Sequence, residues 1–135
     1  MTLISADDKR YVDVGSEQIW FSVLYTAEVF LQDMMQEITF ARDFLSHKKC
    51  SASIALETAR QINLLRDAFS KIPPENVIYD RNQLSFPAPW SNNLSPVITS
   101  CGNLFTTSDG KDLLFELVCL LTYAHYTEVD VYSPN

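Results

Sequence analysis

The chain has 135 residues, of which 47% are apolar and 20% are charged, a balance typical of one globular domain and too apolar for intrinsic disorder. Seventeen acidic residues against ten basic ones give a formal charge of −7, which argues against nucleic acid or an anionic membrane as the main partner. The chain starts without a signal peptide pattern, and no apolar run approaches the ~20 residues of a membrane span. We therefore expect a cytoplasmic protein.

Two helices are predicted in the first half of the chain. A short strand near residues 10–14 comes first, since its valines alternate with polar residues. The first helix is predicted over about residues 16–46, with Ser16 as N-cap and apolar residues recurring every three or four positions. A coiled-coil seam has similar spacing, but this apolar face is wider than a seam. The second helix is predicted over about 53–72 and ends at Pro73.

The second half of the chain is predicted to contain strands near 77–79 and 128–132 and a third helix over about 109–127. The third helix is apolar nearly all round, which predicts that it is buried on most sides. The last strand could pair with either of the other two. These elements predict an α+β fold with three main helices and a small sheet, in one domain over residues 1–135.

A long loop separates the second strand from the third helix. Pro87, Pro89 and Pro96 exclude a helix there, because each removes a backbone donor and favours extended geometry in the preceding residue. Apolar side chains from Phe86 to Phe105 predict an ordered, packed connection, in which Trp90 is held between prolines against the core. The loop is also where a ligand pocket would lie, with Trp90 as a stacking surface.

The candidate catalytic and metal-binding residues are few. His47 and His125 are in no metal-ligand spacing, and three glycines in the whole chain cannot build a phosphate-binding loop. The cysteines, Cys50, Cys101 and Cys119, are odd in number and widely spaced, which predicts free thiols in a reducing compartment. Cys119 and His125 fall on different faces of a helix. Cys50 beside Lys48 and Lys49 could have a lowered pKa, but an exposed polar turn is the simpler explanation. We predict no catalytic residue, no metal and no cofactor.

Acidic residues are concentrated at the two ends of the chain. Residues 1–46 contain eight acids and three bases, residues 47–81 four acids and six bases, and residues 82–135 five acids and one base. If the ends meet, they form one negative face that can attract a basic partner. The predicted partner-binding residues are Asp109, Asp112 and Glu116 on one side of the third helix, and Glu128 and Asp130 on one face of the last strand. Ser108 or Asp109 is the expected cap of that helix, which explains the Asp109 and Asp112 carboxylates better than acid–base catalysis does.

Part of the chain resembles a known family. The similarity is densest from about Pro73 to Leu113 and weaker at Val14-Gly15-Ser16, and the matching segments are Ile72-Pro73-Pro74, Val77-Ile78-Tyr79-Asp80, the run from Pro89-Trp90 to Leu94-Ser95-Pro96, Ile98-Thr99-Ser100, Asn103-Leu104-Phe105 and Thr107-Ser108-Asp109-Gly110 before Asp112-Leu113. These segments resemble the immunity protein 70 family of polymorphic-toxin systems, which include contact-dependent growth inhibition.

The resemblance implies a protein that binds a cognate toxin and neutralises it by covering its active site or substrate surface. A basic nuclease domain is one candidate toxin, although the resemblance does not identify it. The alternative is a small enzyme or ligand-binding domain with a pocket under the 87–96 loop; a toxin gene immediately upstream would favour the first function and a metabolic operon the second. If the five carboxylates do not bind the partner, the outer side of the first helix is the next candidate surface, at Glu28, Asp33, Glu37 and Asp43.

Overall fold

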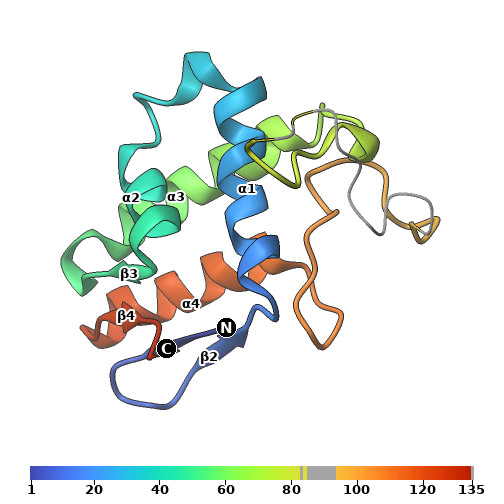
Figure 1. The fold of residues 1–135 in the computed structure, drawn as a ribbon. Helices are drawn as coiled ribbons and strands as arrows, with labels where there is room; N and C mark the ends of the chain where they lie inside the picture. The colour runs from blue at the N-terminus through green and yellow to red at the C-terminus, as the bar shows by residue number, and fades with distance from the viewer. Residues whose placement is uncertain (83, 85–93, 135) are drawn as a thin grey trace.

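The computed structural model describes residues 1–82, 84 and 94–134. Within these residues the chain is an α+β domain with four α-helices and a four-stranded antiparallel sheet, which confirms the predicted fold class (Figure 1). The helices are α1 (Glu17–Phe30), α2 (Thr39–His47), α3 (Ala52–Phe69) and α4 (Leu113–Thr127), with short 3-10 helices η1 (Gln32–Met34) and η2 (Pro74–Asn76). The strands are β1 (Thr2–Ser5), β2 (Tyr11–Asp13), β3 (Lys49–Cys50) and β4 (Val131–Tyr132).

The sheet joins the two ends of the chain in the order β2-β1-β4-β3. The predicted strands near 10–14 and 128–132 are present in shorter form as β2 and β4. β4 pairs with β1 and β3, two strands that the sequence did not predict, and with neither of the predicted ones. Both termini lie beside this sheet (Figure 1). The acidic first and last segments therefore do meet.

The strand predicted near 77–79 is not part of the sheet, because side chains of α1 take its backbone hydrogen bonds. The Ser22 hydroxyl donates to the Ile78 carbonyl at 2.6 Å, and the Ile78 amide donates to Thr26 Oγ1 at 3.0 Å. Gln18, one turn before Ser22, donates to the Tyr79 carbonyl. These three side chains recur every four residues, so one stripe of α1 holds an extended segment in place of a neighbouring strand.

The single helix predicted over 16–46 is wrong, because the chain turns back after Phe30 and forms α2 separately (Figure 1). Trp20 and Phe44 meet edge to face with ring centroids 5.4 Å apart, and the Trp20 indole donates to the Leu45 carbonyl at 2.7 Å. In one straight helix, residues 24 positions apart would be separated by about 36 Å. The apolar stripe is thus buried by packing two short helices against each other.

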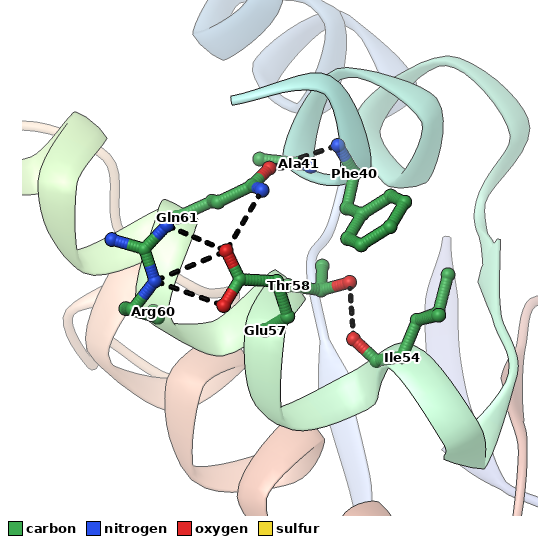
Figure 2. A network of polar contacts seen from close by, with 7 residues as sticks. All are labelled: Phe40, Ala41, Ile54, Glu57, Thr58, Arg60 and Gln61. Atoms are coloured by element: carbon green, nitrogen blue, oxygen red, sulfur yellow. Dashed lines mark hydrogen bonds and ion pairs between the residues drawn. The ribbon is translucent and has the colours of Figure 1, made fainter. Parts of the chain in front are cut away.

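The start of α2 is held by a side chain from α3. Ile38, the N-cap of α2, offers no side-chain acceptor. The Gln61 amide oxygen instead accepts from the Phe40 and Ala41 amides at 2.8 and 3.0 Å, as Figure 2 shows. Glu57 accepts from the Gln61 amide nitrogen at 3.2 Å and forms an ion pair with Arg60. Since uncapped helix amides are costly to bury, this contact fixes α2 on α3.

The core lies between the helices and one face of the sheet, with α3 packed along α4. Phe69 at the end of α3 packs against Phe105 with ring centroids 5.8 Å apart. Leu104 is buried as well, so the end of the long loop is anchored as predicted, but Val97 is 75% exposed and is not an anchor. Pro87, Pro89, Trp90 and the rest of residues 85–93 lie outside the described residues.

Candidate functional site

The loop before α4 places the first three predicted partner-binding residues. α4 begins at Leu113 and not near residue 109, because the Asp112 carboxylate accepts from the Phe115 amide at 3.2 Å and is the N-cap. Asp109 lies in the preceding turn, where Thr107 donates a hydrogen bond to it and lowers the pKa of the Asp109 carboxyl. The expectation that Asp109, Asp112 and Glu116 lie on one side of a helix is therefore wrong.

Asp112 faces the neighbouring helix. Its second carboxylate oxygen lies 2.9 Å from an Arg66 guanidinium nitrogen on α3, and its side chain is 25% exposed. Arg66 also lies over the Phe115 ring, 5.6 Å from the centroid. Because Asp112 both caps α4 and pairs with α3, much of its carboxylate is already occupied within the chain.

Asp109 and Glu116 line one side of a groove of about 270 Å³ between β2 and the start of α4. Lys9, Arg10 and Asp13 line the opposite side, and Lys111 lies 3.5 Å from Asp109. The groove therefore contains three carboxylates and three cationic side chains in close proximity.

A second hollow of about 370 Å³ continues along α4, past Cys119 and Tyr123. Both hollows are bordered by Arg10, Tyr11, Val12 and Glu116, so they form one groove, which we call the β2–α4 groove. Arg10 lies over the Tyr123 ring, 5.3 Å from the centroid, and the Tyr123 hydroxyl donates to Asp7 at 2.6 Å. The groove is bordered by side chains that are already held by their neighbours.

Glu128 and Asp130 lie at the opposite end of α4. Glu128 ends the helix in a left-handed conformation (φ 58), and neither residue is in a strand because β4 begins at Val131. Asp130 accepts from the Ala52 amide at 2.8 Å, at the start of α3. Asp112 and Glu128 are 16 residues apart along a helix, or about 24 Å. The five predicted residues therefore form two groups and not one face.

The outer face of α4 was not predicted as a surface. Leu113, Leu114, Leu117, Leu120, Leu121 and Ala124 are buried, but Phe115 is 49% exposed and Tyr126 is 73% exposed. Cys119 is exposed between them. The prediction of burial on most sides is wrong for this face. The available signal was the absence of Lys and Arg from residues 113–127.

The thiols and imidazoles do not form a catalytic arrangement. Burial raises the pKa of Cys50 and raises that of Cys101 to about 12. Neither the lowered pKa nor the exposed turn considered for Cys50 is correct, because this residue is buried in β3. His47 contacts the Asp43 carbonyl at 3.0 Å, and His125 packs against Tyr126 with ring centroids 4.8 Å apart. In residues 1–82, 84 and 94–134, no three His, Cys, Asp or Glu side chains gather as a metal site.

The alternative function would place a ligand pocket under the 87–96 loop, of which residues 94–96 are described. A hollow of about 340 Å³ is bordered by Ile19, Leu94, Ser95, Ile98, Leu104, Phe105 and Thr106. Its described lining is apolar apart from two hydroxyl groups and contains no ionisable side chain. Trp90, the proposed stacking surface, is not among the described residues.

The remaining predicted surface is divided by the break in the first helix. Glu28 is on α1 and pairs with Arg81, Asp33 is on η1, Glu37 is in the turn that follows, and Asp43 is on α2. They do not lie along one helix. Among the described residues, no helix has both the length and the apolar composition needed to cross a membrane.

These features define a small acidic α+β domain with a charged surface groove and an exposed apolar helix face. The chain belongs to the immunity protein 70 family, whose model matches residues 6–132. Membership implies that the chain neutralises a cognate toxin, and immunity proteins of this kind are typically inhibitors without enzymatic activity. No curated protein and no solved structure matches the chain.

Proposed function

We propose that the chain binds its cognate toxin directly in the cytoplasm and neutralises it by covering the toxin's active site or substrate surface. Membership of the immunity protein 70 family is the observation that carries this proposal. Occlusion requires a complementary surface and no reacting group, which suits a site made of a shallow groove and a helix face.

The charge of −7 supports a basic toxin, of which a nuclease domain is the leading candidate. A nuclease must attract an anionic substrate, so its active-site surface is commonly basic. An acidic inhibitor is drawn to that surface by long-range attraction, which raises the association rate most at low salt. The carboxylates of the proposed surface are Asp109, Glu128 and Asp130, which are exposed, and Glu116, which is partly exposed. Asp112 is expected to act mainly through the fold.

The mechanism is tested by titrating the toxin's activity with the purified chain. Occlusion predicts that inhibition is complete when the chain equals the toxin in concentration, and that the two proteins co-elute. Complete inhibition by a small fraction of an equivalent would show that the chain acts on many toxin molecules in turn, and would overturn occlusion.

The acidic surface is tested by a matched pair of double variants that remove the same charge. Asp109→Asn with Glu116→Gln should slow association at low salt and flatten its salt dependence. Asp33→Asn with Glu37→Gln neutralises two exposed carboxylates in η1 and in the turn before α2, and should change association much less. If the second pair slows association more than the first, binding occurs along the α1–α2 side. Equal rates for both pairs and the parent would show that neither surface steers binding.

A further inference from the structure

The outer face of α4 presents a stripe of side chains without charge. Phe115, Cys119, Thr122 and Tyr126 follow one another at spacings of four, three and four residues, so they line one side of the helix over about 17 Å. We call these four residues the α4 stripe. Phe115, Cys119 and Tyr126 are exposed and Thr122 is partly exposed. An apolar row of this kind on a surface helix is typical of a binding site.

The composition of α4 sets it apart from the neighbouring helix. Residues 113–127 contain no Lys or Arg, and Glu116 is their only acid. The exposed side of α3, in contrast, includes Glu57, Arg60 and Asp67. A helix on the surface of a domain normally directs charged residues to solvent, as α3 does. The outer side of α4 therefore departs from the pattern that solubility alone would favour.

The β2–α4 groove places two tyrosines, Tyr11 and Tyr123, beside the α4 stripe. Tyr11 on β2 is 70% exposed and borders the groove opposite Cys119 and Tyr123. Tyr123 is fixed by its hydrogen bond to Asp7 and by Arg10 above its ring. Tyrosines at protein interfaces contribute a large contact area at a low entropic cost, and side chains that are already ordered lower that cost further.

Glu128 marks the far end of the stripe at a position that the fold disfavours. Its left-handed backbone (φ 58) suits Gly or Asn, and its carboxylate lies at the negative end of the helix dipole. Lys48 ends α2 in the same conformation (φ 60), but there the cation complements the dipole and pairs with Glu17 at 2.9 Å. The Glu128 carboxylate makes no hydrogen bond or ion pair with any described residue. A partner outside the chain would account for it.

We propose that the α4 stripe is the apolar centre of the toxin-binding surface, and that the carboxylates at its two ends, Glu116 and Glu128, contact basic side chains around it. This inference rests on the proposed function. The negative charge of the chain favours the cognate toxin as the occupant of this surface and disfavours a second copy of the chain. Two copies packed through antiparallel α4 helices would place Glu128 of each beside Asp112 and Glu116 of the other, in chains of net charge −7.

The exposed thiol in the stripe allows a test on the unmodified protein. Cys119 is exposed, whereas Cys50 and Cys101 are buried, so alkylation of the native chain with iodoacetamide should label Cys119 first. Labelling is followed by mass spectrometry at pH 8.5, because burial and Glu116 raise the pKa of this thiol. We expect saturating toxin to slow Cys119 labelling at least about tenfold, as for a fully buried interface residue.

The outcomes separate this inference from the proposed function. If the parent chain does not bind the toxin encoded beside it, both fail. If the chain binds and neutralises the toxin while Cys119 is labelled at an unchanged rate, only the α4 surface is wrong. Concentration-dependent protection of Cys119 in the free chain, together with a dimer in sedimentation, would assign the stripe to a second copy and overturn the choice of occupant.

A matched pair of substitutions gives an independent measurement. Phe115→Ala and Tyr126→Ala should each speed toxin dissociation about tenfold or more, since aromatic residues at the centre of an interface dominate binding. Phe30→Ala is the control, because Phe30 ends α1 and its exposure of 44% is close to the 49% of Phe115. Equal dissociation rates for Phe115→Ala, Tyr126→Ala and Phe30→Ala would overturn the inference.

Discussion

Replacing Glu128 should stabilise the fold and weaken toxin binding. In Glu128→Gly, release of the left-handed strain is worth about 1–2 kcal/mol, and the greater freedom of glycine in the unfolded chain takes back about 0.5–1 kcal/mol. Removing the carboxylate from the negative helix end adds about 0.3 kcal/mol. The sum is a gain of about 1 kcal/mol, or about 3–5 °C in Tm for a domain of this size.

Thermal and urea unfolding of the purified chain measure this gain directly. Glu128→Asn is the companion variant, since Asn tolerates the left-handed region without the flexibility of glycine. Lys48→Gly is the matched control: it relieves the same strain but loses the Glu17 ion pair and the contact of the ammonium with the Phe21 ring, 5.0 Å from its centroid. Its gain should be smaller or absent. A lower Tm for both Glu128 variants would refute the argument that this position is strained.

Three further predictions concern the fold around the candidate surface. Gln61→Leu leaves two amides at the start of α2 without their acceptor and should lower the free energy of unfolding by about 2 kcal/mol in urea denaturation; an unchanged midpoint would show that water replaces the cap. Gly102→Ala places a methyl carbon 3.2 Å from the Arg66 carbonyl oxygen and 3.2 Å from Ser70 Cα, and should cost about 1–2 kcal/mol in the same measurement. An unchanged midpoint would show that the loop moves to accept the methyl group. Hydrogen bonds from Ser5, and to a smaller extent from Tyr123, lower the pKa of Asp7 to about 2. The ionised carboxyl therefore stabilises the fold above about pH 4, and this stabilisation is lost as the pH falls towards 2. NMR titration should give a higher pKa for Asp7 in Tyr123→Phe than in the parent, and an equal value would remove Tyr123 as a cause.

The sequence predicted the fold class because hydrophobic periodicity is a local property that does not depend on how the helices and strands pack together. It could not show the break after Phe30, since the polar residues from Gln32 to Glu37 fit the outer face of a continuous helix as well as they fit a turn. Nor could it show that the Ser22 and Thr26 side chains make the backbone hydrogen bonds of Ile78 that a neighbouring strand would otherwise make. Both features depend on contacts between residues far apart in the chain, which local patterns do not contain.

The candidate surface was predicted in part. Counting charges identified the carboxylates, but only the start of α4 at Leu113 separates Asp112, which is occupied by Arg66, from the more accessible Asp109. The apolar face of α4 was hidden by its similarity to the buried face: Leu117 and Tyr126 are both apolar in a pattern, and only the packing of α3 and the sheet distinguishes them. A composition without Lys or Arg was the available signal.

The position of β4 in the sheet has a consequence for the timing of protection in a growing cell. β4 lies between β1 and β3, yet it is the last element of the fold to be synthesised. Until it emerges from the ribosome, the N-terminal hairpin and β3 have no common partner, and this pairing spans almost the whole chain, which makes it a slow contact to form. A nascent chain therefore cannot complete its sheet until residues 131–132 have left the ribosome. Protection against a toxin would then depend on copies of the immunity protein that have already been synthesised and folded when the toxin arrives.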